Sequence, residues 1–302
     1  MGDGVARPLT VKTHIFFLIH LGMICGSLRF SQAENPASTT GLYGATLGAG
    51  AATAAQRMAF GQNPAALLPA ETGGLASGFH LDYHRPYGMD DLSVSEAGAY
   101  CDFKQGGFQL SWKETSLLEV YHEQGFSFNP SFRFGNRHNS FPGFLDIGTV
   151  LTFWRFDFPE QQNFFTGTHG YGLVWQPLPR FKTGGFILGL PVPGLPGPNL
   201  EQIWQYGFEA TSRGFERGSQ NGFWQTLRLD FRKSNSTSWR TLAAWSFNPN
   251  SACQLTAAFA STPFQASFGI DCGFVGWRWY QAIRYHRFLG RTILSGLSFV
   301  SP

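Results

Sequence analysis

Apolar and polar residues alternate along most of the chain. From Leu75 onward, short stretches repeat with a period of two, and clusters of Gly, Pro, Asn and Ser separate them. A period of two puts neighbouring side chains on opposite faces, so each stretch predicts a β-strand with one apolar face. We count about fourteen strands, each near the roughly 9 to 11 residues that cross a bilayer. They span 75–83, 92–102, 107–113, 118–128, 144–157, 169–176, 183–190, 202–211, 222–232, 237–247, 252–261, 264–272, 276–286 and 290–299.

The clearest predicted hairpin turns at Thr262 and Pro263. Its register places large side chains opposite small ones, as good cross-strand packing requires. The pairs are Phe259 with Ala266, Ala257 with Phe268, and Leu255 with Ile270. The same register sets Cys253 opposite Cys272. A disulfide between them is one hypothesis, because a directly cross-strand bridge needs a close pair, and two small apolar cysteines are the other.

The two faces of the predicted strands fit either a soluble sandwich or a membrane barrel. In span 222–232, Phe223, Leu227 and Leu229 alternate with Arg228 and Asp230. A sandwich would turn the charged face to water, whereas a membrane barrel turns the apolar face to lipid. Aromatic residues near strand ends favour the barrel, because interfacial girdles are aromatic. These residues are Trp154, Phe156, Phe158, Trp239, Trp245 and Phe247.

Composition narrows the choice further. Only 14% of the 302 residues are charged, too few to cover the surface of a secreted soluble protein. A soluble secreted β-protein is therefore the less favoured alternative. The 31 Phe, 9 Trp and 9 Tyr exclude a disordered chain, and 22 basic against 19 acidic residues give no basic footprint for nucleic acid. No segment after residue 33 has the roughly 18 apolar residues of a spanning helix.

The first 33 residues have the pattern of a secretory signal peptide. Arg7 and Lys12 precede a short apolar run over 15–24, and Ser31-Gln32-Ala33 supplies the small residues that a signal peptidase reads. We therefore expect cleavage after Ala33 and export through the bacterial periplasm.

Both ends of the remaining chain resemble a known family. Small residues lead from Gly48 to Asn63-Pro64-Ala65 and then to the first strand, and residues 285–299 look like a last hairpin. These segments resemble the FadL and PorV/PorQ superfamily of Gram-negative outer-membrane barrels. The resemblance implies an all-β fold: a single antiparallel transmembrane barrel of about fourteen strands over 73–302, with 34–72 as a plug in the lumen. Twelve strands remain an alternative, and so does a disordered linker in place of the plug.

Catalytic and metal signatures are missing from the sequence. It contains no G-x-S-x-G, H-E-x-x-H, paired C-x-x-C or P-loop motif, so we expect no enzymatic activity. The histidines are scattered, and we predict neither a metal site nor a cofactor.

The polar faces of the predicted strands carry a mildly cationic set of side chains that would line the lumen. Such charges either pair with one another or receive a ligand, and an arginine fork suits the carboxylate of an anionic hydrophobic molecule. The candidate ligand-binding residues are Arg155, Arg228, Arg278, Arg284 and His286. Two functions remain open: porin-like transport of hydrophobic small molecules across the outer membrane, or a non-enzymatic role beside proteins of a secretion or surface-attachment system.

Overall fold

The computed structural model describes most of the chain after residue 75 and parts of the segment before it. The described residues are 46, 47, 49, 50, 52, 62–65, 76–103, 105–118, 121–135, 143–158, 163–195, 200–214, 223–249, 252–274 and 276–300. The signal peptide predicted over 1–33 lies outside them. None of the described residues forms a helix long and apolar enough to cross a membrane.

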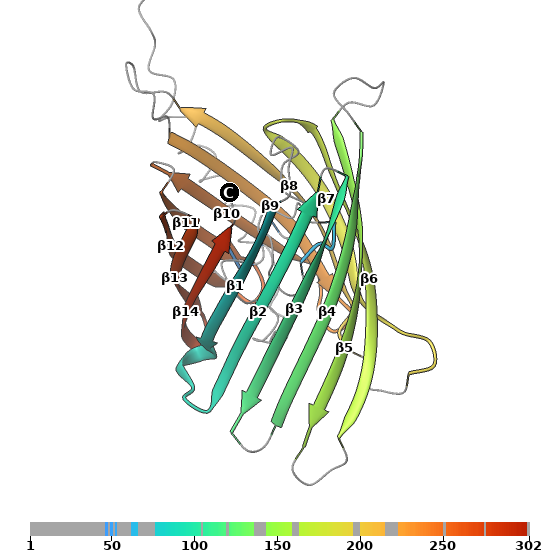
Figure 1. Cartoon of the computed structure of the whole chain (residues 1–302). Helices are drawn as coiled ribbons and strands as arrows, with labels where there is room; N and C mark the ends of the chain where they lie inside the picture. Colours follow the sequence, from blue (N-terminus) through green and yellow to red (C-terminus); the bar gives the residue numbers. More distant parts are fainter. Residues whose placement is uncertain are drawn as a thin grey trace, which may run out of the picture.

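Fourteen antiparallel strands form a closed barrel (Figure 1). The strands are β1 (Ala76–Arg85), β2 (Leu92–Phe103), β3 (Gly106–Leu117), β4 (Tyr121–Phe134), β5 (Phe144–Asp157), β6 (Phe164–Leu178), β7 (Phe181–Pro191), β8 (Ile203–Gly214), β9 (Phe223–Ser234), β10 (Arg240–Asn248), β11 (Cys253–Ala260), β12 (Gln265–Phe274), β13 (Trp277–His286) and β14 (Gly290–Val300). A single turn of 3-10 helix, η3 (Pro86–Gly88), joins β1 to β2.

Every strand pairs with its neighbours in sequence, and β1 pairs with β14 to close the ring. All fourteen predicted spans overlap an observed strand, so the predicted fold class and strand number are confirmed and the twelve-stranded alternative is wrong. Closure satisfies the backbone hydrogen bonds that an open sheet edge would leave to solvent. The even strand number brings the start of β1 and the end of β14 to the same end of the barrel.

The β11–β12 hairpin has the register expected from the sequence. Phe259 lies opposite Ala266, and Cys253 lies opposite Cys272. The two sulfur atoms are 3.2 Å apart, and both cysteines are free thiols. Their shared face is the outer face of the barrel, because Gln254 and Asp271 point the other way.

We expect mild oxidation to join these two thiols, because two sulfurs at this separation on paired strands need little movement to reach bonding distance. Thiol titration of the unfolded protein, beginning after Ala33, should then fall from three groups to one. A Cys253→Ser variant should keep both of its remaining thiols under the same oxidant. Persistence of all three thiols in the oxidised wild type would contradict the expectation.

The strands present an apolar face outward and a polar face inward. Large apolar side chains are exposed around the whole outer wall, among them Leu81, Phe108, Leu110, Phe126, Phe128, Ile147, Leu151, Phe153, Tyr171, Leu173, Phe208, Phe268, Ile283 and Leu297. Charged and polar side chains are buried on the inner face, among them His80, Asp82, Glu96, Lys113, Asp146, Glu209, Arg228, Asp230, Arg232, Arg240, Asp271 and Arg284. This inverts a soluble β-protein and is the arrangement of a membrane-spanning barrel.

At the end of β5 the sequence prediction is wrong. It placed Arg155 in the lumen and Trp154 and Phe156 in an outer aromatic girdle, and the structure reverses these faces. Phe156 is buried in the barrel and stacks on Phe164, and the Trp154 indole donates a hydrogen bond to Thr168. Arg155 therefore points outward, where its side chain is 46% exposed and lies over the Phe165 ring. Neither Trp154 nor Phe156 belongs to an outer aromatic girdle.

Candidate functional site in the barrel lumen

The described residues between 46 and 65 contact the inner wall of the barrel. Asp230 on β9 provides the first anchor: its carboxylate accepts hydrogen bonds from the backbone N–H groups of Gly50 (3.0 Å) and Ala52 (2.9 Å). The Gln205 amide, from β8, donates to the same carboxylate at 2.6 Å. Asp230 is fully buried, so these donors replace the water that the carboxylate loses.

Asn63 provides the second anchor. Its side-chain amide donates to the backbone carbonyl of Ala52 (2.6 Å) and to wall carbonyls at Leu173 (2.9 Å) and Gly185 (3.2 Å). Its side-chain oxygen accepts from the N–H of Ala65 at 2.9 Å, which closes a turn around Pro64. Asn63 thus ties its own turn to β6 and β7.

Three glycines on the inner wall make room for this segment. A Cβ atom on Gly148 would lie 2.1 Å from the Pro64 carbonyl oxygen, and one on Gly184 would lie 2.1 Å from that of Ala52. A Cβ on Gly172 would lie 1.9 Å from the Asn63 side-chain oxygen. These strand glycines permit a close backbone approach that no other residue would allow.

A small apolar cluster fixes the beginning of the described segment. Leu47 and Ala49 pack with Leu242 and Ala244 of β10 and with Ala258 and Ala260 of β11. Their side chains are almost fully buried. The described residues before β1 therefore contact the inner wall from β5 to β11.

A cavity of about 160 Å³ lies beside this segment, between Gln62 and the inner faces of β3 to β8. One part of its wall is polar, with Gln62, Ser111, Lys113, Glu123 and Asn129. Within the described part of the chain, neither the Gln62 amide nor the Ser111 hydroxyl nor the Asn129 side-chain oxygen makes a hydrogen bond. Buried polar groups of this kind are usually satisfied by water or a ligand.

The other part of the cavity wall is apolar, with Val150, Trp154, Phe156, Leu188 and Ile203. An apolar wall with a few convergent polar groups is the usual composition of a small-molecule site. No sequence pattern predicts this cavity, because its wall combines residues from six strands with Gln62.

The candidate ligand-binding residues do not converge on one site. Arg155 is outside the barrel. Arg228 donates to Glu209 at 3.0 Å and to Ser246 at 2.7 Å, and Arg278 contacts both carboxylate oxygens of Asp271 at 3.1 Å. Arg228 and Arg278 thus belong to ion pairs within the wall. This agrees with the first of the two alternatives above, in which the lumenal charges pair with one another.

Arg284 and His286 are buried on the inner face of β13, remote in the strand order from Arg228 on β9. The His286 Nδ1 atom accepts hydrogen bonds from the N–H groups of Phe288 (3.2 Å) and Leu289 (3.1 Å). This histidine therefore supports the β13–β14 turn.

The sequence matches no protein-family model and no curated protein. Several solved structures of β-barrels are similar to it at low identity. Omp33 of Acinetobacter baumannii is 7% identical, with 75% of this chain and 97% of that chain covered and a TM-score of 0.48. The deltaS2S3 mutant of the monoaromatic hydrocarbon channel TodX is 9% identical (79% and 91% covered, TM-score 0.45), and the KdgM porin 8% (74% and 98%, TM-score 0.39).

Proposed function

We propose that this chain is an outer-membrane channel for small, mainly hydrophobic molecules, with the segment around Asn63 as a plug in its lumen. The apolar outer wall supports a membrane location, since only helices and closed barrels satisfy their backbone in lipid. Among membranes, single-chain antiparallel barrels with an even strand number are typical of the bacterial outer membrane.

The observation that carries the proposal is the cavity beside Gln62. Its volume of about 160 Å³ is close to that of an engineered cavity of about 150 Å³ that binds benzene. Trp154 and Phe156 offer aromatic surface to a ring, and the Gln62 amide and Ser111 hydroxyl offer hydrogen bonds to a polar substituent. The substrate class is therefore a single-ring molecule with one polar group.

This substrate class differs from the anionic hydrophobic molecule considered from the sequence. Its proposed binding site is the cavity beside Gln62 and not the ion pairs of Arg228 and Arg278. Arg228 and Arg278 already bind carboxylates of the wall, so an anionic ligand would have to compete with Glu209 and Asp271. Lys113 lines the cavity, and so do the carboxylates of Glu123 and Glu201. Because both signs of charge are present, we expect a neutral polar substituent to bind better than a carboxylate.

A cavity-filling variant tests the proposal. Ser111→Phe should occupy the cavity and weaken phenol binding roughly tenfold, about 1.4 kcal/mol, through lost contacts with the wall. Binding is measured by calorimetry on the folded protein in detergent, and phenol uptake into proteoliposomes should fall in parallel. The matched control is Ser95→Phe, which adds the same ring to the outer face of β2.

Benzoate and toluene serve as comparison ligands, with weaker binding expected for each. Equal phenol binding by wild type and Ser111→Phe would contradict the proposed site. Absence of phenol uptake by folded, reconstituted wild type would contradict the transport function itself.

A further inference from the structure

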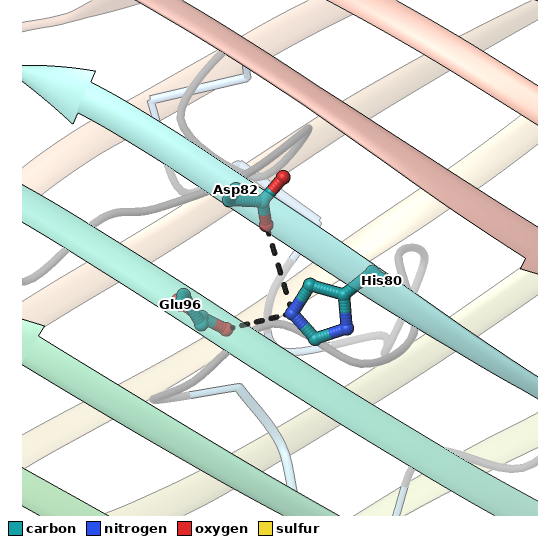
Figure 2. Close-up of side chains that lie close together, drawn as sticks. All are labelled: His80, Asp82 and Glu96. Atoms are coloured by element: carbon teal, nitrogen blue, oxygen red, sulfur yellow. Dashed lines mark hydrogen bonds and ion pairs between the residues drawn. The ribbon is translucent and has the colours of Figure 1, made fainter.

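Three buried side chains converge on the inner face of β1 and β2. None of them lines the cavity beside Gln62. His80 and Asp82 lie two residues apart on β1, and Glu96 faces Asp82 directly across the β1–β2 pair. Figure 2 shows both carboxylates directed at one ring nitrogen of His80. That atom, Nε2, is 3.1 Å from Glu96 Oε1 and 3.6 Å from Asp82 Oδ2.

We propose that His80, Asp82 and Glu96 bind a divalent first-row transition metal ion, with Zn²⁺ the best fit. Zinc lies about 2.0 to 2.2 Å from nitrogen and oxygen ligands, so two tetrahedral ligands are separated by about 3.4 Å. The two measured separations lie on either side of that value, and the three ligand atoms are all within 4.8 Å of one another. One imidazole with two carboxylates suits Zn²⁺ better than Mg²⁺ or Ca²⁺, which prefer oxygen alone.

The charges of the cluster also favour a cation. Asp82 and Glu96 are like charges directly opposite each other, with side chains only 4% and 0% exposed, an arrangement that is unfavourable without a counter-charge. Lys113 faces Glu96 from β3 and lines the cavity together with Glu123 and Glu201, so the carboxylates around it outnumber its single positive charge. A divalent ion would supply the remaining positive charge.

The fold positions the cluster through a second contact. The Tyr280 hydroxyl, on β13, donates a hydrogen bond to Asp82 across the intervening strand β14. Gly296 lies between them in the register, and a Cβ there would be 2.0 Å from Asp82 Oδ1 and 2.4 Å from the Tyr280 ring. Tyr280 is therefore a positioning residue that orients one ligand carboxylate, as hydrogen-bonding partners of metal ligands commonly do.

The competing explanation is an ion triad in which a protonated His80 bridges the two carboxylates. An imidazolium donates from both ring nitrogens, yet Nδ1 of His80 has no acceptor among the described residues. The triad would thus keep a charged N–H buried and unsatisfied, which is more costly than the same N–H on a neutral, metal-bound ring. The two explanations predict opposite results in a metal-binding experiment.

The test uses the folded protein beginning after Ala33, without an affinity tag, in detergent and after treatment with a chelator. Equilibrium dialysis against Zn²⁺, followed by metal analysis, should give one ion per chain for the wild type. Asp82→Asn and Glu96→Gln should each lose at least 100-fold in affinity, more than the 10- to 100-fold typical of an outer partner. Tyr280→Phe should fall within that 10- to 100-fold range.

His84→Gln is the matched control, because His84 is equally buried on the same face of β1 but outside the cluster. It should bind Zn²⁺ as the wild type does. Heat-modifiable gel mobility shows that each variant is folded. Co²⁺ bound to the wild type should show the visible bands of a low-coordinate site, a readout that needs no variant.

Failure of the wild type to retain Zn²⁺ would overturn the proposal and favour the ion triad. Retention of wild-type affinity by Asp82→Asn and Glu96→Gln would also overturn it, since the ion would then lie elsewhere. Neither result depends on phenol binding or transport, so this inference and the proposed function stand or fall separately.

Discussion

Replacing two inner-wall glycines by valine, Gly148→Val with Gly184→Val, should open the barrel. The new Cβ atoms would each lie 2.1 Å from a backbone carbonyl oxygen, that of Pro64 or Ala52, an atom that cannot rotate away. The wall is a closed hydrogen-bonded ring, so the backbone at Ala52 and Pro64 has to move instead. If the closed state can no longer form the two backbone hydrogen bonds to Asp230, it becomes less stable by at least about 3 kcal/mol, and the open population rises roughly a hundredfold. Single-channel conductance in planar bilayers measures the change.

The matched control is Gly185→Val. Gly185 adjoins Gly184 but belongs to the outer face of β7, and a Cβ there would meet its nearest neighbour at 3.2 Å. Its conductance should remain that of the wild type. Asp230→Ala removes the anchor without adding volume and should open the channel as well. If both inner-wall variants fold and conduct like the wild type, the segment around Asn63 does not close the lumen.

An arginine on the outer wall should destabilise the barrel in lipid by up to about 2–4 kcal/mol, the cost of a cation at the bilayer midplane. Ile283 is the position of choice, because it lies within β13 and is 54% exposed on the apolar outer face. Urea unfolding of Ile283→Arg and wild type in phospholipid vesicles gives the difference in unfolding free energy.

Ile283→Val is the control, since it keeps the position apolar and removes only one methylene group. We expect it to change the unfolding free energy by less than about 1.5 kcal/mol. If the arginine variant unfolded like the valine variant, the outer face of β13 would not contact lipid. A soluble barrel would show equal unfolding of the two variants, because its outer face would contact water.

Residue alternation predicted the strands because it is a local property of the chain. Each strand has one face toward the outside and one toward the lumen, so a period of two is visible within about ten residues. The prediction failed at Arg155, where Phe153, Trp154 and Phe156 are all aromatic. With large apolar residues on both faces, the alternation no longer identifies the outer face.

The candidate site likewise has one part that a local pattern predicts and other parts that it does not. The Asn63-Pro64 turn was visible in the sequence, because this pair has a strong local preference for turns. Its partners were not visible: Asn63 contacts Leu173 across 110 residues and Gly185 across 122. The contact of Gly50 with Asp230 spans 180 residues, and that of Tyr280 with Asp82 spans 198. No local pattern encodes contacts at such separations.

The sequence by itself predicted about fourteen strands, the register of the β11–β12 hairpin and the apolar character of one face, while leaving a twelve-stranded barrel open. The tertiary structure alone decided which lumenal charges meet. Closure of the ring brings β13 within reach of β1 through β14, and this places Tyr280 against Asp82. The physical reason is that alternation selects a face for each side chain, whereas a binding site requires particular side chains from distant strands to share one level of that face.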